Sequence, residues 1–156
     1  MLPAPDPRTD GARFSLGFPA DITRVRRALA DLLAAPQVRA LGGADRGTVE
    51  LVLAEVLNNI VEHAYAGGTG PVEVDLWATN TGLSFRVADA GSAMPDGTLP
   101  PGQLPDLPPF GDGPSELADL PEGGFGWHLI RSLTRDLTYA RHGGRNLLTF
   151  AIALDG

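Results

Sequence analysis

The sequence contains no cysteine and no lysine: all twelve basic residues of the 156-residue chain are arginines. The absence of cysteine excludes disulfide frameworks, thiolate zinc sites and cysteine nucleophiles, and leaves three histidines for acid–base or metal chemistry. The absence of lysine excludes a Walker-type phosphate loop and the lysine-dependent protein-kinase site, because both place an ammonium group on the phosphates. Two common ways of holding nucleotide phosphates are therefore missing.

Positive charge and long apolar runs are also scarce. Nineteen acidic residues outnumber the arginines, giving a net charge of −7 and a pI near 4.8. Because non-specific nucleic-acid affinity comes from cations that neutralise phosphates, we expect no direct nucleic-acid partner. The longest apolar run, residues 147–154, is far shorter than the roughly 20 residues that cross a bilayer, and the N-terminus lacks a secretion signal. We therefore expect a cytoplasmic protein that does not use a membrane.

The length predicts one globular domain, residues 13–156, after a flexible lead at 1–12. Apolar periodicity predicts a helix over 22–33 capped by Asp21, and a long helix from an N-cap at Thr48 to about residue 66. The remaining predicted elements are strands at 13–18, 71–78, 83–88, 137–141 and 147–154, and a helix at 127–133. This order predicts an α+β two-layer sandwich, with a mostly antiparallel sheet covered by helices on one face.

A long loop separates the second pair of predicted strands from the last helix. Eight of the 14 prolines lie between Pro95 and Pro121, which prevents a long regular helix or strand there. A short amphipathic piece at 115–120 interrupts the loop. Because structureless loops of this length inside compact domains are usually lids, binding loops or disordered segments, residues 95–123 are a candidate lid.

Glu55, Asn59 and His63 recur at every fourth position of the predicted long helix and project from nearly one face. Neighbouring members lie about 6 Å apart along the axis, so a carboxylate and an amide oxygen can flank a metal-bound phosphate and a nucleophile. The alternative is a solvated polar face. His63 completes the stripe, but we interpret it as a structural residue that packs or hydrogen-bonds at the helix end. The adjacent Asn58 adds weight to a site, because two asparagines in mid-helix cost stability.

Asp89 ends an apolar strand and is followed two residues later by Gly91. Such a carboxylate can accept a hydrogen bond from an exocyclic amino group, and the glycine lets a flat ring approach the backbone. The alternative is an ordinary strand end with an Asx turn, because aspartate and glycine are common turn residues. Taken alone, this pair favours the turn.

A glycine cluster, residues 122–126, runs directly into the last predicted helix. Backbone N–H groups at a helix start form an anion site, and Gly124 and Gly126, on either side of Phe125, let phosphates come close. The alternative is a flexible hinge before a helix. The cluster closes the proline-rich loop, where a nucleotide lid would be anchored. Arg131 is the nearest cation in the sequence.

The three motifs, in this order, resemble the ATP-binding domain of the GHKL superfamily. Glu-x-x-x-Asn at 55–59 is similar to its N box, Asp-x-Gly at 89–91 to its first glycine box, and Gly-Phe-Gly at 124–126 to its second. Within the superfamily, the chain resembles most the anti-sigma factor serine kinases. Their phrases are similar to residues 59–65 (NIVEHAY), 122–126 (EGGFG), 128–131 (HLIR) and 136–139 (DLTY). The resemblance covers roughly residues 13–154.

The resemblance implies ATP and Mg²⁺ as cofactors and a role for each motif residue. Asn59 would bind Mg²⁺ through its side-chain oxygen, and Glu55 would be the general base that orients the attacking hydroxyl. Asp89 would read the adenine amino group, with Gly91 giving the ring room. Thr149, on the last strand, would lie near the adenine behind these residues.

The resemblance also implies roles for the glycine cluster and for the first helix. Gly124, Phe125 and Gly126 would let the lid backbone wrap the phosphates, and the helix that follows would direct its positive end at them. Arg24, on the first helix, matches the position of an arginine that meets the partner protein, although an exposed arginine is usually only solvated surface. A homodimer is also implied.

The function implied is an anti-sigma factor serine/threonine kinase. It would phosphorylate a serine of an anti-sigma factor antagonist of the STAS type, and it would sequester a sigma factor in its other state. One alternative is a module that binds nucleotide and captures its partner without catalysing transfer. A second alternative, the catalytic fragment of a histidine kinase, is disfavoured because no helix preceding the domain offers a phospho-accepting histidine.

Overall fold

The computed structural model of the chain describes residues 13–100 and 124–154. The predicted lead at 1–12, most of the candidate lid and its short amphipathic piece at 115–120 lie outside the described residues. Within them, the single sheet and the helices follow one another in the predicted order. No helix in this part of the chain combines the length and apolarity that a membrane span requires.

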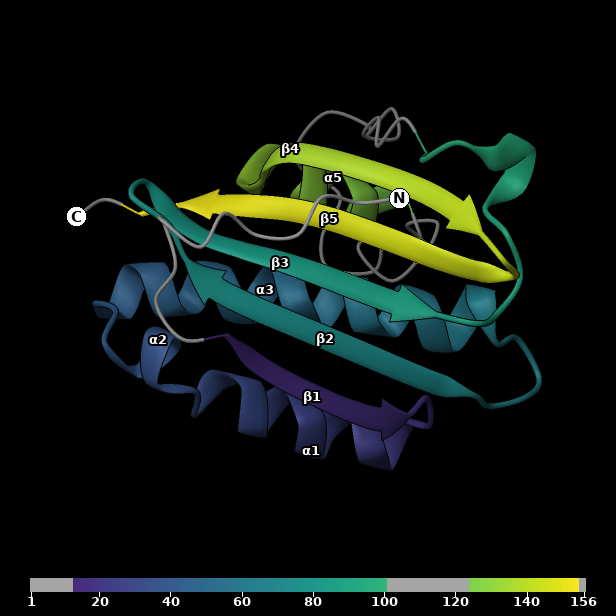
Figure 1. Ribbon diagram of the computed structural model, residues 1–156, viewed down its shortest axis with the longest axis horizontal. Helices are drawn as coiled ribbons and strands as arrows, with labels where there is room; N and C mark the ends of the chain where they lie inside the picture. The colour runs from purple at the N-terminus through teal and green to yellow at the C-terminus, as the bar shows by residue number, and fades with distance from the viewer. Residues whose placement is uncertain (1–12, 101–123, 155–156) are drawn as a thin grey trace, which may run out of the picture.

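The sheet has five antiparallel strands in the spatial order β1-β2-β3-β5-β4 (Figure 1). Their bounds are Phe14–Pro19 for β1, Pro71–Ala78 for β2, Gly82–Asp89 for β3, Arg135–His142 for β4 and Arg145–Ala153 for β5. Gly143 and Gly144 both have positive φ and form the tight turn between the last two strands. The predicted antiparallel sheet is confirmed.

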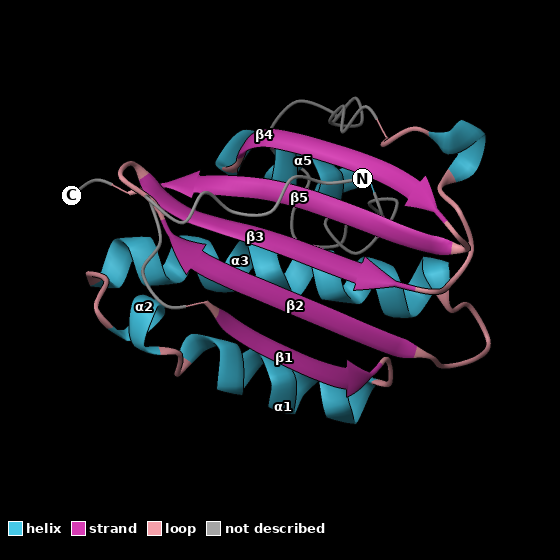
Figure 2. Ribbon diagram, in the orientation of Figure 1, coloured by secondary structure: helices cyan, strands magenta, loops and turns pink. Residues whose placement is uncertain are grey.

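The helices lie together on one face of this sheet (Figure 2). They are α1 (Ile22–Leu33), α2 (Pro36–Arg39), α3 (Gly43–Asn59) and α5 (Gly124–Leu133). A π-helical turn, Ile60–Ala64, continues directly from α3. The arrangement is the two-layer α+β sandwich that the order of the elements predicts.

Two helix starts show how local chemistry sets the boundaries. At α1 the predicted cap is confirmed, because the Asp21 carboxylate accepts the N–H of Arg24 at 2.8 Å. The predicted cap at Thr48 is wrong, since α3 already begins at Gly43. Thr48 lies inside the helix and its hydroxyl donates to the carbonyl of Ala44 at 3.2 Å. Asp45 in the first turn supplies the negative charge that favours the earlier start.

The core lies between the sheet and the helices. Alternate residues of β2, β3 and β5 point into it, and α3 is buried along its inward face. Phe85 and Phe150 stack at its centre, with ring centroids 5.0 Å apart. The fully buried side chains of β2, β3 and α3 include Val74, Leu76, Leu83, Phe85, Val52, Leu53, Val56 and Leu57.

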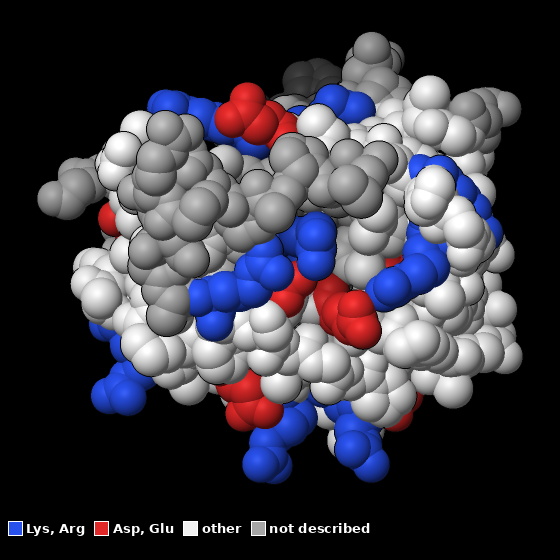
Figure 3. All heavy atoms as spheres, in the orientation of Figure 1, with Lys and Arg blue, Asp and Glu red and all other residues white. Residues whose placement is uncertain are grey.

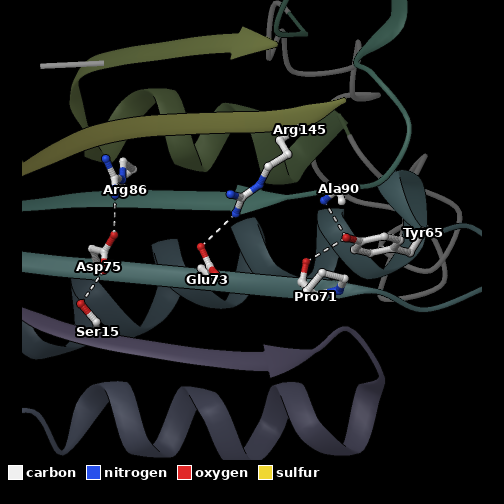
Figure 4. Close-up of polar contacts among 8 residues, drawn as sticks. All are labelled: Ser15, Tyr65, Pro71, Glu73, Asp75, Arg86, Ala90 and Arg145. Atoms are coloured by element: carbon white, nitrogen blue, oxygen red, sulfur yellow. Dashed lines mark hydrogen bonds and ion pairs between the residues drawn. The ribbon is translucent and has the colours of Figure 1, made fainter. Parts of the chain in front are cut away.

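The opposite face of the sheet is polar. Asp75 on β2 accepts hydrogen bonds from Ser15 on β1 and from Arg86 on β3, the latter at 3.1 Å (Figure 4). Glu73 on β2 pairs with Arg145 on β5 at 2.9 Å. Figure 3 shows arginine and carboxylate side chains meeting near the middle of this face. The two faces of the sheet therefore differ in chemistry: the apolar face supports the helices.

Candidate functional site

A cavity of about 540 Å³ lies between the helical layer and the sheet. Its walls come from α3, the π-helical turn, the strands β3, β4 and β5, α5 and the segment that follows β3. Its polar lining residues are Asn59, His63, Asp89, Ser92, Tyr139 and Asn146. Apolar residues, among them Val56, Ile60, Val87, Met94, Trp127 and Leu148, supply the rest of the wall. A mostly apolar cavity with a few polar groups is typical of a small-molecule site.

On the helix side of this cavity Asn59 lines the wall, and Glu55 and Gly126 lie next to it. A Cβ atom on Gly126 would lie 2.6 Å from Oε2 of Glu55 and 3.9 Å from Nδ2 of Asn59. Both side chains therefore point at the first turn of α5, which confirms that they share one face of α3. Any side chain at 126 would push the Glu55 carboxylate out of place.

Asn59 carries an unsatisfied polar group. The residue is 8% exposed, and its Nδ2 has no hydrogen-bond partner among the described residues. An orphaned buried amide costs about 1–3 kcal/mol, so its place in a cavity wall indicates a ligand. The amide oxygen and nitrogen are interchangeable by a flip. An amide oxygen is a hard ligand that suits Mg²⁺, which is often held by few protein groups, with phosphates and water completing the shell.

Glu55, one turn before Asn59, has a raised pKa. Partial burial raises the pKa of this carboxyl above its ordinary value of 4.5, and the negative charge of Glu62 raises it further. A carboxylate with a raised pKa holds a proton more readily than an ordinary glutamate. The position and the pKa both suit a general base.

The π-helical turn places His63 on the cavity wall. Its side chain is 61% exposed and its Nε2 lies 4.0 Å from the Glu62 carboxylate. The prediction of a packed or hydrogen-bonded structural role at the helix end is therefore wrong. The extra residue in each π turn changes which side chains face inward, and such turns recur at functional sites. His63 nevertheless shares the cavity wall with Asn59, as the spacing of four residues predicts.

The sheet side of the cavity is formed by Asp89, Asn146 and Tyr139. Asp89 ends β3 and is 6% exposed, and its Oδ1 accepts from the N–H of Gly91 at 2.9 Å and from Nδ2 of Asn146 at 2.8 Å. Its Oδ2 has no hydrogen-bond partner within the described ranges. The first of these bonds is the Asx turn that the sequence offered as the alternative, so the turn and the cavity wall coexist.

Gly91, two residues after Asp89, occupies a position where a side chain has no room. An added Cβ would lie 2.3 Å from the carbonyl oxygen of Ala64, a backbone atom. The same carbonyl accepts the N–H of Ser92 at 2.8 Å. The turn after β3 is thus pressed directly against the end of the π-helical turn, and this contact positions Asp89 relative to the helical layer.

Tyr65 fixes the same turn from the other side. Its hydroxyl accepts the N–H of Ala90 at 2.6 Å and donates to the carbonyl of Pro71 at 2.8 Å (Figure 4). Burial raises the pKa of this hydroxyl, so it keeps its proton for the bond to Pro71. The ring lies where a Cβ on Gly70 would be, 2.4 Å from the nearest ring atom. The end of the helical layer is thereby joined to the ends of β2 and β3.

Asn146 is a site residue that the sequence analysis missed. It is 6% exposed on β5, opposite Asp89, and faces the cavity like Leu148 on the same strand. Its Oδ1 accepts from the hydroxyl of Tyr139 at 2.6 Å and from Arg141 at 2.9 Å. The sequence did contain a signal. Asn146 falls on the same alternation as the inward-facing apolar residues of its strand, and a polar side chain at such a position is buried and needs hydrogen-bond partners.

Comparison with known proteins identifies the family. A profile of the histidine kinase-like ATPase domain matches residues 18–152. The chain belongs to this family. It is also similar to the serine/threonine-protein kinase BtrW of Bordetella bronchiseptica, with 35% identity over 106 residues that cover 67% of this chain and 68% of BtrW. An ATPase domain implies ATP binding, and the kinase relative supports an ATP-dependent, kinase-type activity.

The first turn of α5 in this ATPase domain contains Gly124, Phe125 and Gly126. The predicted start at residue 127 is wrong, since Gly124–Gly126 are already helical. Gly126 is the member whose place against Glu55 and Asn59 is described. Trp127 is 4% exposed and packs in the cavity wall.

Two predicted residues of the ATPase domain lie away from the cavity. Thr149 sits between the inward-facing Leu148 and Phe150, so it points to the opposite face of the sheet, where its hydroxyl bonds to that of Thr138. Thr149 therefore does not face the cavity, contrary to the prediction, and Asn146 is the residue of β5 that bonds to Asp89 there. Arg24 is exposed on α1, and its predicted role toward a partner stays a prediction.

Proposed function

We propose that this chain is a magnesium- and ATP-dependent protein serine/threonine kinase that acts on an anti-sigma factor antagonist. The observation that carries the proposal is the convergence of Glu55 and Asn59 on Gly126 beside the cavity. A carboxylate with a raised pKa next to an unsatisfied amide supplies a proton acceptor and a metal ligand in one place. The printed name of BtrW, a serine/threonine-protein kinase, supports the same reaction class.

The nucleotide is oriented by the two sides of the cavity. Oδ2 of Asp89 accepts a hydrogen bond from the adenine amino group, because Oδ1 is already occupied by protein donors. The apolar wall, which includes Val87, Met94 and Leu148, encloses the ring. The triphosphate then extends toward Asn59 and the first turn of α5, whose N-terminal dipole favours negative charge.

Mg²⁺ fits the helix side, since Asn59 offers a buried amide without a partner. Asn59 would hold the ion through its amide oxygen, and the ion would neutralise charge on the phosphates and complete its shell with phosphate oxygens and water. Residues of this chain then do the positioning. Asn59 orients the phosphate end, and Gly126 leaves room for Glu55 to face it.

Transfer of the γ-phosphoryl group needs a proton acceptor and no covalent intermediate with the protein. The serine oxygen of the antagonist attacks the γ-phosphorus, Glu55 accepts the serine proton, and the bond from the γ-phosphorus to the β,γ-bridging oxygen breaks to release ADP. The raised pKa of Glu55 favours this proton transfer. The product carries a phosphoserine, whose added charge of about −2 changes how the antagonist docks.

The partners follow from the resemblance to anti-sigma factor serine kinases. A STAS-type antagonist is the phosphoryl acceptor, and a sigma factor is held when the antagonist is phosphorylated and released. Arg24 is suited to contact with a partner because it is exposed near the start of α1. A homodimer is the proposed assembly.

The test combines the purified chain, labelled ATP with Mg²⁺, and each STAS-type protein of the native host. We expect one of these proteins to gain phosphate on serine, located by mass spectrometry, and the label to disappear with Glu55→Gln. Binding of the sigma factor is measured in the same mixtures. Failure of every such protein to gain phosphate, while the chain binds ATP, would exclude the kinase.

A non-catalytic, nucleotide-dependent binding module is the second candidate. One observation favours it: the guanidinium of Arg131, the cation nearest the glycine cluster in the sequence, is already bonded to the carbonyls of Pro100, at 2.8 Å, and Leu99, at 3.5 Å. Calorimetry that shows binding of ATP and of a sigma factor, with an antagonist that never gains phosphate, would select this candidate.

A further inference from the structure

The donors of Gly91, Asn146 and Tyr139 next to Asp89 are committed to bonds within the protein. Asn146 uses both N–H groups of its amide, one on Oδ1 of Asp89 and one on the carbonyl of Ser92, each at 2.8 Å. The N–H of Gly91 is also on Oδ1 of Asp89. The Tyr139 hydroxyl donates its hydrogen bond to Oδ1 of Asn146.

The orientation of the Asn146 amide is fixed by its partners. Oδ1 faces two donors, the Tyr139 hydroxyl and the Arg141 guanidinium, whereas Nδ2 faces two acceptors. A flipped amide would place N–H groups against donors and an oxygen against the Asp89 carboxylate. The network therefore allows one orientation of the amide, which removes the ambiguity that asparagine usually has.

The network is also anchored to the chain that follows β3. Arg141 donates to the carbonyl of Gly91 at 2.7 Å, and the Tyr139 hydroxyl accepts the N–H of Met94 at 3.0 Å. Asn146 is consequently held from both sides, and it holds Asp89 in turn. The polar groups on the sheet side form a pre-organised unit.

Oδ2 of Asp89 is the hydrogen-bond acceptor that this unit leaves for a ligand. A purine with an amino group at C6 donates to it. A purine with an oxygen at C6 brings its own acceptor against the carboxylate, and the neighbouring donors of Gly91, Asn146 and Tyr139 are already used. Ser92 has the remaining hydroxyl of this stretch, and it is exposed.

We propose that Asn146, held by Tyr139 and Arg141, sets the base selectivity of this site. By occupying Oδ1 of Asp89 and exposing no free N–H, it makes the site accept 6-aminopurines and reject 6-oxopurines. Asn146 is a positioning residue in this account, because it acts through Asp89. The inference rests on the proposed nucleotide-binding function and adds to it the source of discrimination.

The test compares ADP with IDP, which differ at C6 of the purine, by isothermal titration calorimetry on the full chain. We expect the wild type to bind ADP about 100-fold more tightly than IDP. Asn146→Ala opens space for water, which can donate to a 6-oxo group, so the ADP/IDP ratio falls by about tenfold. Tyr139→Phe keeps the ring but frees the amide to rotate, and it lowers the ratio in the same direction.

Thr149→Val is the matched control, because Thr149 lies on the same strand as Asn146 but faces the other side of the sheet. It leaves both affinities unchanged. Ser92→Ala tests the exposed hydroxyl apart from the network, and we expect the ADP/IDP affinity ratio to stay the same. Circular dichroism monitors folding, and Tyr139→Phe decides the matter if Asn146→Ala does not fold.

Equal losses of ADP and IDP affinity in Asn146→Ala and Tyr139→Phe would overturn the selectivity role and leave nucleotide binding intact. Equal binding of ADP and IDP by the wild type would overturn it as well. A wild type that binds neither nucleotide would overturn the proposed function itself, so the two failures are distinguishable.

Discussion

The two sides of the cavity are satisfied to different degrees. On the sheet side, Asp89 and Asn146 are almost fully buried and bonded to each other and to their neighbours. On the helix side, the buried amide of Asn59 has an atom without a partner, and the pKa of Glu55 is raised by burial and by Glu62. The donors of Gly91, Asn146 and Tyr139 on the sheet side are already used and leave a ligand one acceptor, Oδ2 of Asp89, whereas the helix side keeps an amide nitrogen without a partner in the described part of the chain.

This difference separates recognition from chemistry. A network whose donors are all hydrogen-bonded holds its side chains in a fixed geometry, which suits the recognition of a rigid base. An unsatisfied amide and a carboxyl that resists ionisation reduce the stability of the folded protein, and such groups persist where a ligand or a reaction uses them. Substitutions on the two sides should therefore have opposite effects on stability, although both weaken function.

Glu55→Gln is expected to have the largest effect. It removes the proton acceptor but keeps the size of the side chain against Gly126, so phosphoryl transfer falls by about 10²–10⁴-fold while ADP affinity is unchanged. Single-turnover transfer of labelled phosphate to the antagonist measures the rate, and calorimetry measures the affinity. Glu50→Gln, an exposed position of the same helix, is the control. A loss of ADP affinity equal to the loss of rate would contradict the assignment of a base.

Asn59→Ala is expected to lower the affinity for Mg²⁺-ATP by at least about tenfold. Because the change also removes an unsatisfied buried group, the melting temperature should not fall with it. Asn58→Ala, at the exposed neighbouring position, is the matched control and leaves the affinity unchanged. If affinity measured without Mg²⁺ falls as far as affinity measured with it, Asn59 is not the magnesium ligand.

Gly91→Ala tests the sheet side, where stability and binding should fail together. The new Cβ meets the carbonyl of Ala64, a backbone atom that cannot rotate away, so we expect a loss of about 1–3 kcal/mol in the free energy of unfolding. Asp89 moves with the turn, and nucleotide affinity drops. Denaturant unfolding measures the stability. Gly68→Ala is the control, since its Cβ would lie no closer than 4.0 Å to a neighbour; equal stability of the two variants would refute the contact.

Glu62→Gln is expected to have the smallest effect, on pH dependence. It removes the charge that raises the pKa of Glu55, so the acid limb of the kcat/KM profile moves to lower pH. Stability gives the matching sign. The pKa of Glu55 in the folded protein lies above its ordinary value of 4.5, so ionisation of this carboxyl destabilises the fold as the pH rises from 4.5 through the raised pKa. Glu55→Gln should therefore stabilise the protein at neutral pH but not below pH 4.5. An acid limb that stays in place would argue against Glu55 as the titrating base.

Most of the fold could be predicted because its signals are local. Asp21 caps α1 by a hydrogen bond within one turn, and the alternation of β2 and β3 reports burial directly. Thr48 was misassigned as a cap because it has the chemistry of one, but the start of α3 depends on Gly42 and Asp45 further upstream. Helix starts depend on several competing local groups, which one residue type does not reveal.

The site was predictable in part for the same reason. Glu55 and Asn59 lie on one helix, so their spacing alone brings them together. Asn146 and Asp89 are 57 residues apart, and their bond depends on the strand order β3-β5 and on register. Thr149 was chosen without that register, which turns it to the opposite face. The spacing placed His63 on the correct face, but its exposure depends on tertiary packing at the end of the helix, which spacing does not report.

A crystal structure of the chain with Mg²⁺ and a non-hydrolysable ATP analogue tests the central claim most directly. The account predicts the adenine amino group on Oδ2 of Asp89, Mg²⁺ on the amide oxygen of Asn59, and Glu55 facing the γ-phosphate. A nucleotide bound outside the cavity, or one with its phosphates at Asp89 and its base at Asn59, would contradict it.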